Sequence, residues 1–206
     1  MPNTYSNFFD MRDPTSNRAF RADLEPSFET ALSLTRCEST SSVPIGAFWF
    51  FGGRQPGDVI WTGYGVAVIL HDRVVEVLRQ SRFSGWTVLP CALRGKEGQA
   101  ISGYSFLQVS GKSGPIDDSL AEVVEKEYPA RRVQELRGLY FQPDTWDGSD
   151  FFIPKDTAII MVTKSVRDAL KHARVRNVLF TSLSEMQRSL PSTDSRATSK
   201  NQEPFP

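Results

Sequence analysis

Three aspartates, Asp144, Asp147 and Asp150, lie close together in one short stretch of the chain, with Trp146 between them. Closely spaced carboxylates can bind a divalent cation or share the acid and base steps of a hydrolysis. Asp144 also follows a proline and Asp147 precedes a glycine, and both pairs are common in turns. The stretch is therefore either a structural loop or the reactive centre of a small hydrolase or transferase.

The chain has two histidines, His71 and His172. His71 follows an apolar run, and a histidine at the end of a strand can act as a general base. It is the second candidate catalytic group for the enzyme alternative. Cys37 and Cys91 stand far apart in the sequence, so they form neither a Cys-x-x-Cys metal pair nor a disulfide framework. We expect no metal and no cofactor.

Two short motifs resemble catalytic signatures but lack a residue that the chemistry requires. Gly111-Lys112-Ser113 matches the end of a phosphate-binding loop, but Phe106 stands where that loop needs its first glycine. Gly103–Leu107 resembles a nucleophile elbow, which needs a small residue where Leu107 stands so that strand and helix can pack closely. We therefore predict that the chain has no catalytic residues and is not an enzyme.

The charge balance argues against a nucleic-acid partner. The chain has 24 basic and 24 acidic residues, whereas proteins that bind nucleic acid through its phosphates usually carry a basic excess. One predicted helix is basic, through Lys164, Arg167, Lys171, Arg174 and Arg176. No aromatic residue lies between these cations to stack on bases, so we interpret them as a solvated helix face.

Neither a membrane segment nor a secretory signal is predicted. The longest aliphatic run, Val66–Leu70, is far shorter than the roughly 20 residues of a membrane-spanning helix. The N-terminal residues lack the basic and apolar regions of a signal peptide. We expect a cytoplasmic protein in which both cysteines are reduced.

The elements that must position these residues occur in the same order twice, 92 residues apart. Apolar runs predict strands at 58–61, 66–70 and 86–89, with a helix between the last two, and again at 150–153, 158–162 and 178–180. Four residues of the first copy recur at this offset: Asp58, Val74, Leu78 and Arg82 match Asp150, Val166, Leu170 and Arg174. A matched order of elements over this length predicts an internal duplication.

We therefore predict an α+β fold, in which two related strand–strand–helix–strand units pack around mixed sheets with helices on one side. Residues 1–56 form an N-terminal α/β segment with a buried strand at Ala47–Phe51, and residues 138–190 form the second unit. Residues 191–206 are rich in Ser, Thr and Pro. This tail cannot bury enough apolar area to offset its ordering entropy, so it is predicted to be disordered.

The first unit, residues 57–137, is predicted to contain a connecting hairpin and a helix in addition to its repeated elements. Asp117 or Asp118 has the right chemistry to cap the start of that helix. Its apolar face would consist of Leu120, Val123, Val124 and Tyr128.

Three stretches resemble a known group of bacterial proteins. They are Gly103–Asp117, Gly138–Phe152 and Val162–Leu170, of which the last has the pattern Val-Thr-x-x-Val-x-x-Ala-Leu. Over about residues 57–185 the chain is similar to the double-CXXCG-motif family and to related immunity proteins of polymorphic toxin systems. Those relatives have two cysteine pairs near the N-terminus, which suit a structural zinc ion. Here that region has only Cys37, so the cysteine pairs are not retained.

The resemblance implies a cytoplasmic protein that binds a cognate bacterial toxin and neutralises it by occlusion. Such a protein needs a rigid surface with aromatic anchors and complementary charge, because a few buried side chains supply most of the affinity of an interface. We expect Tyr140, Trp146 and Asp147 to contact the toxin. The alternative remains a small hydrolase or transferase that uses His71 or the aspartates of the 144–150 stretch.

Overall fold

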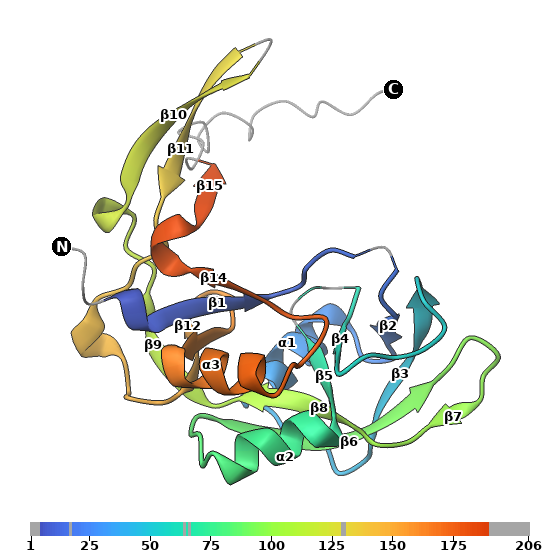
Figure 1. Cartoon of the computed structure of the whole chain (residues 1–206). Coiled ribbons are helices and arrows are strands. Elements are labelled where there is room, and N and C mark those ends of the chain that lie inside the picture. Colours follow the sequence, from blue (N-terminus) through green and yellow to red (C-terminus); the bar gives the residue numbers. More distant parts are fainter. Residues whose placement is uncertain (1–4, 17, 64, 66, 129–130, 190–206) are drawn as a thin grey trace, which may run out of the picture.

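The computed structural model describes residues 5–16, 18–63, 65, 67–128 and 131–189. Within these residues the chain forms three β-sheets and three α-helices (Figure 1). Both parallel and antiparallel strand pairs occur, so the predicted α+β class with mixed sheets is confirmed. The tail that we predicted to be disordered lies outside the described residues.

The largest sheet curls into a small barrel. Its strands, in spatial order, are β2 (Arg21–Leu24), β3 (Ile45–Phe51), β6 (Trp86–Arg94), β8 (Tyr104–Val109), β5 (Val68–His71) and β4 (Val59–Trp61), and β7 (Ala100–Ile101) pairs with β6. A bridge between Ala22 of β2 and Thr62 after β4 joins the two ends of this order. Helix α1 (Phe28–Thr35) buries Ala31 and Leu34 in the barrel core.

The second sheet combines strands from distant parts of the chain. Its order is β14 (Leu179–Ser182), β1 (Phe8–Arg12), β13 (Met161–Thr163), β12 (Phe151–Lys155) and β9 (Gly111–Pro115). The N-terminal strand β1 pairs antiparallel with β13 on one side and with β14 on the other. The second predicted unit is thus completed by a strand from the N-terminal segment, a pairing that the sequence did not predict.

The predicted helix after Asp117 is wrong. Asp117 caps only a short 3-10 helix, Asp118–Leu120, and the chain then forms a long hairpin of β10 (Glu122–Tyr128) and β11 (Arg131–Arg137), to which β15 (Gln187–Ser189) adds. This hairpin projects from the body of the molecule (Figure 1). Adjacent β-branched residues and a cross-strand ion pair between Glu122 and Arg137 (2.5 Å) favour the strand conformation here.

Helices α2 (Asp72–Gln80) and α3 (Lys164–His172) lie against each other and share one core with both sheets. Their apolar residues recur at helical spacing and are buried, so one face of each helix is held in that core: Val74, Val75 and Leu78 in α2, Val166 and Leu170 in α3. Among the described residues, no helix is long and apolar enough to cross a bilayer.

The prediction that the helices lie on one side is wrong, because α1 packs on the opposite face of β8 from α2. Leu107 and Val109 of β8 belong to the core with α2 and α3, whereas Phe106 belongs to the core with α1. The side chain of Gln108 points toward α1 and donates a hydrogen bond to Leu34 O (2.7 Å). Alternate residues of a strand face opposite sides of a sheet, so β8 serves both cores.

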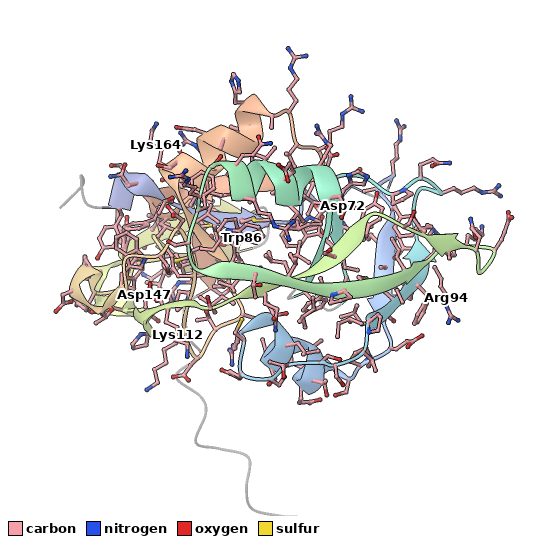
Figure 2. The ribbon with its side chains drawn as sticks, turned by 90° about the horizontal axis from the view of Figure 1, so that it is seen from below. Asp72, Trp86, Arg94, Lys112, Asp147 and Lys164 are labelled. Carbon is pink, nitrogen blue, oxygen red and sulfur yellow. The ribbon has the colours of Figure 1, made fainter. Side chains whose placement is uncertain are left out.

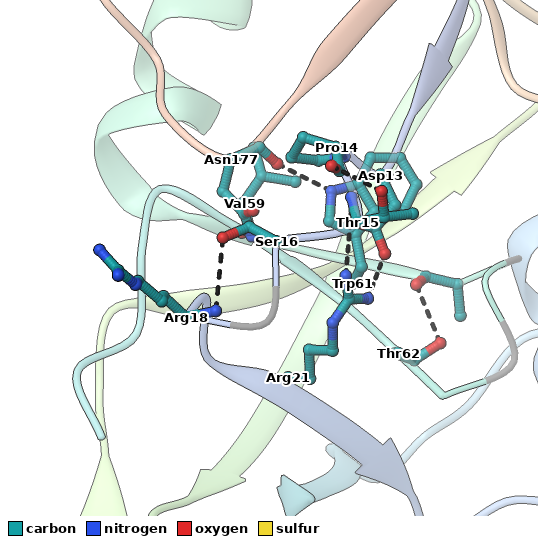
Figure 3. Close-up of polar contacts among 11 residues, drawn as sticks. Asp13, Pro14, Thr15, Ser16, Arg18, Arg21, Val59, Trp61, Thr62 and Asn177 are labelled. Atoms are coloured by element: carbon teal, nitrogen blue, oxygen red, sulfur yellow. Dashed lines mark hydrogen bonds and ion pairs between the residues drawn. The ribbon is translucent and has the colours of Figure 1, made fainter. Parts of the chain in front are cut away.

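Two side chains tie the barrel to the segment before β14. The indole N–H of Trp61 donates to Asn177 O (2.8 Å), and the side-chain amide of Asn177 donates to Val59 O (2.7 Å) (Figure 3). Asn177 has a φ of +63°, a conformation that asparagine tolerates better than most residues. The barrel and the second sheet are therefore linked by hydrogen bonds as well as by apolar packing.

Candidate functional site

The loop between β11 and β12 carries the three aspartates and is held by hydrogen bonds from its own side chains. It contains a short 3-10 helix, Pro143–Thr145. The Thr145 hydroxyl donates to Gln142 O (2.6 Å) and accepts from Gly114 N (2.8 Å) on the neighbouring strand β9. These contacts fix the start of the loop on the edge of the second sheet.

Asp147 is exposed, but both of its carboxylate oxygens are used within the structure. One accepts a hydrogen bond from Lys112 N (2.8 Å), and the other accepts from the backbone N–H (3.0 Å) and hydroxyl of Ser149. Partial burial raises the pKa of Asp147, but these hydrogen bonds outweigh it and hold the pKa below its usual value. Asp147 is therefore a carboxylate at neutral pH, and it links the loop to β9.

Asp150 also acts as a hydrogen-bond acceptor between segments. Its carboxylate accepts from Ser84 N (2.9 Å) and from the Thr163 hydroxyl (3.0 Å). Asp144 is exposed on the 3-10 helix, so the three predicted aspartates do not converge on one point. Within the described residues, no group of three His, Cys, Asp or Glu side chains is placed to hold a metal ion.

Tyr140 and Trp146 are half-buried against a cluster of aromatic rings at the edge of the second sheet. Trp146 meets Phe8 edge-on with ring centroids 4.9 Å apart, and its indole N–H donates to Ser149 O (3.0 Å). Tyr140 lies 4.5 Å from the ring of Tyr5. Each predicted contact residue thus has a structural contact and also an accessible part.

A groove of about 680 Å³ lies beside Trp146, between the aspartate loop and the start of α3. Phe8, Trp146 and Pro143 supply its apolar wall, and its rim is charged. Lys164 and Asp168 on that rim form an ion pair (2.5 Å) one helical turn apart. The groove therefore combines an aromatic wall with charges of both signs.

His71, the second predicted catalytic group, lies at the start of α2. Its Nδ1 accepts a hydrogen bond from Arg73 N (3.1 Å), so His71 is the N-cap of the helix. Its ring meets that of Tyr104 edge-on at 5.0 Å. These contacts give His71 a structural role, and the groove beside Trp146 does not include it.

The basic face of α3 is partly neutralised by its own surroundings. Arg167 lies with its guanidinium 4.0 Å from the centroid of the Phe9 ring and forms an ion pair with Asp168 (2.5 Å). Lys164 shares the same aspartate. Lys171 and Arg174 are exposed at the end of the helix.

A second pocket, of about 340 Å³, lies between β9, β12 and the segment that follows α1. Lys112 of the motif that resembles a phosphate-binding loop lines it, together with Arg36 and Lys155. Arg36 donates to the backbone oxygen of Thr157. Burial raises the pKa of the adjacent Cys37 thiol, while Lys112 lowers it by a smaller amount.

An exposed aromatic surface on β3 was not predicted from the sequence. We predicted Ala47–Phe51 as a buried strand, but Phe48, Phe50 and Phe51 are 39%, 50% and 38% exposed. Ala47 is buried in the barrel core, so alternation along the strand turns Phe48 and Phe50 outward. A run in which every residue is apolar hides the alternation that separates an inner from an outer face.

No protein-family model matches the chain, and no match is found among curated proteins.

Proposed function

We propose that this chain is a non-enzymatic protein-binding module, an immunity protein that neutralises a cognate bacterial toxin by occlusion. The observation that supports it is the groove beside Trp146, whose aromatic wall and charged rim adjoin a loop held by its own hydrogen bonds. A preorganised surface loses little conformational entropy on binding. The toxin as partner rests on the resemblance of residues 57–185 to immunity proteins of polymorphic toxin systems.

In this proposal three residues contact the toxin, each in a different way: Tyr140, Trp146 and Asp147. Trp146 offers an aromatic edge to a toxin side chain that enters the groove, and aromatic anchors of this kind often dominate interface affinity. The exposed Asp147 adds a negative charge that steers a basic partner. Tyr140, whose ring is tilted against that of Tyr5, extends the aromatic surface.

The alternative, a small hydrolase or transferase, finds less support in the geometry. Asp147 and Asp150 are occupied by backbone and hydroxyl donors, and His71 caps a helix. An enzyme of this kind would have to release one of these groups before it could transfer a proton. Among the candidate carboxylates, only Asp144 is exposed and accepts no hydrogen bond from a described residue.

The scaffold of this surface, we infer, is an internal duplication. The unit β4–β5–α2–β6 and the unit β12–β13–α3–β14 have the same element order. Each also pairs in the same way with one further strand: Leu70 lies opposite Ser105 of β8, and Val162 lies opposite Phe9 of β1. Strand β1 in the second unit therefore corresponds to strand β8 in the first unit.

The test is binding to the toxin encoded next to this chain's gene, with both proteins purified. We expect calorimetry to give a one-to-one complex and the toxin's activity to fall in proportion to the complex formed. Asp144→Lys, on the exposed rim of the loop, should weaken binding at least tenfold, whereas Glu97→Lys, in an exposed turn of the barrel, should not. Absence of binding at micromolar concentrations would contradict the proposal.

A further inference from the structure

A row of three side chains crosses the outer face of the barrel with opposite charges on its flanks. Asp23 of β2 lies opposite Phe48 of β3, and Phe48 lies beside Arg94 of β6 in the parallel register. The next row, Leu24, Ala47 and Leu93, is buried in the barrel core. Because neighbouring rows face opposite sides of a sheet, Asp23, Phe48 and Arg94 all face outward.

Phe48 and Phe50 form the apolar centre of this outer face. They are 39% and 50% exposed, and they lie two positions apart along the strand, so both point outward. Phe51 meets Phe50 edge-on, with ring centroids 5.2 Å apart. Adjacent exposed aromatic rings on a soluble protein usually mark a surface that another molecule covers.

The two flanking charges have no ion-pair partner in the described part of the chain. Among the described residues, Asp23 accepts a hydrogen bond only from the backbone N–H of Leu24 (2.9 Å). Arg94 is exposed and forms no side-chain hydrogen bond or ion pair with a described residue. Figure 2 shows Arg94 at the end of the molecule away from Lys112 and Asp147, so this face is separate from the groove beside Trp146.

We propose that this face binds a second copy of the same chain, in a dimer with two-fold symmetry. Strands in a sheet are evenly spaced, about 4.8 Å apart, so Asp23 and Arg94 flank Phe48 at similar distances. A two-fold axis that runs parallel to β3 above Phe48, in the plane between the two copies, therefore exchanges the two flanks. Asp23 of each copy then faces Arg94 of the other, and the Phe48 rings meet at the centre.

The same rotation places Phe50 of each copy opposite Phe50 of the other, because an axis parallel to β3 keeps each position along the strand at the same level. The exposed rings of Phe48 and Phe50 from both copies then form one apolar centre. Each aromatic residue meets its own copy and each charge meets the opposite charge, which is the self-complementarity that a two-fold interface needs.

The charge pattern favours a second copy over a nucleic acid. The face carries the carboxylates of Asp23 and Glu25 next to its aromatic centre, and these would repel a phosphate backbone. A polyanion fits a face with cations on both flanks, whereas this face has the cation Arg94 on one flank and the anion Asp23 on the other. Only a partner with the reversed arrangement satisfies both flanks, and a rotated copy of the chain has that arrangement.

Sedimentation equilibrium of the purified chain tests the proposal. The concentrations should run from micromolar to about 1 mM, a range that spans the dissociation constants expected of a small interface. We expect a concentration-dependent monomer–dimer equilibrium. Asp23→Arg and Arg94→Asp should each weaken it at least tenfold, because one substitution places like charges together twice in a symmetric dimer. Phe48→Ser should also weaken it, and Arg137→Asp, on the projecting hairpin, is the matched control that should not.

Two further samples separate this geometry from a general charge effect. The double variant Asp23→Arg/Arg94→Asp exchanges the flanks, so it should dimerise like the wild type. An equimolar mixture of the two single variants should form a heterodimer in which all flanking contacts are favourable, although each variant alone is monomeric. Circular dichroism and thermal unfolding confirm that each variant is folded.

The proposal is overturned if the wild-type chain stays monomeric throughout the concentration range. It is also overturned if the single variants dimerise as tightly as the wild type, or if mixing folded single variants produces no heterodimer. A monomeric wild type whose toxin binding is lost in Phe48→Ser would assign this face to the toxin instead. None of these results depends on whether the groove beside Trp146 binds a toxin.

Discussion

Asp58 and Asp150 accept reciprocal hydrogen bonds across the junction of the two units. Asp58 accepts from Arg176 N (2.8 Å), in the turn after α3, and Asp150 accepts from Ser84 N (2.9 Å), in the turn after α2. Both pairs of residues, Asp58 with Asp150 and Ser84 with Arg176, are 92 apart in the sequence. Each unit thus supplies a carboxylate that fixes the helix end of the other.

Removal of one of these carboxylates is expected to destabilise the whole chain. Asp58 also pairs with Arg73 (2.6 Å), so Asp58→Ala leaves an arginine and a backbone N–H without their acceptor. We expect the free energy of unfolding to fall by about 1–3 kcal/mol, measured by urea denaturation. The exposed Asp144→Ala should change it by less than about 0.5 kcal/mol. Equal effects of the two substitutions would contradict this role of Asp58.

The buried Asp10 is expected to make stability fall as pH rises. Asp10 lies in β1 between β13 and β14 and is 6% exposed. Burial raises its pKa from 3.8 to about 6, and Arg12, 3.7 Å away, only partly opposes the increase. Between these two pH values the folded chain binds a proton that the unfolded chain has released, so folding becomes less favourable as pH rises.

The variant Asp10→Asn removes this titration while it keeps the size of the side chain. We expect the wild type to lose up to about 3 kcal/mol of stability between pH 4 and pH 7 relative to the variant, because one pH unit corresponds to about 1.4 kcal/mol. Urea denaturation of both proteins at several pH values measures the difference. Parallel pH profiles would show that Asp10 is not the responsible group.

Gly85 is expected to tolerate no side chain. Its φ is +80°, and a Cβ there would lie 2.1 Å from Phe151 O, in the strand of the other unit. Gly98 has nearly the same φ, +79°, but open space around it. We therefore expect Gly98→Ala to cost about 1–2 kcal/mol from backbone strain, and Gly85→Ala to cost clearly more. Thermal unfolding of both variants measures the difference, and equal losses would contradict the close approach of the two units.

Cys91 is expected to resist alkylation in the folded protein. Burial raises its pKa to about 12, and only the thiolate reacts with iodoacetamide. Mass spectrometry of the chain treated at pH 8 should therefore show very slow modification of Cys91 until denaturant is added. Rapid labelling of Cys91 in the folded chain would show that β6 opens readily at this position.

The local pattern of the sequence predicted much of the secondary structure. Val74 and Leu78, like Val166 and Leu170, recur at helical spacing, and both pairs are buried in helices. Strands also form at the predicted positions 58–61 and 150–153, as β4 (Val59–Trp61) and β12 (Phe151–Lys155). These features could be predicted because a helix and a strand each impose their own period on the apolar residues of a short segment.

The arrangement of the candidate sites was much less accessible. The sequence grouped Asp144, Asp147 and Asp150 by proximity, but hydrogen bonds to β9 and to the turn after α2 point them apart. The half-burial of Trp146 follows from its contact with Phe8, which lies far away in the chain. No local pattern specifies a ring contact between residues so distant in sequence.

Local periodicity was enough to predict the α+β class, the helices α2 and α3, and strands such as β4 and β12. Only the tertiary structure placed β1 between β13 and β14, replaced the predicted helix after Asp117 with a hairpin, and turned Phe48 outward. The physical reason is that strand pairing joins residues remote in sequence. A strand's own residues show its period, but the partner strands decide which side of it is buried.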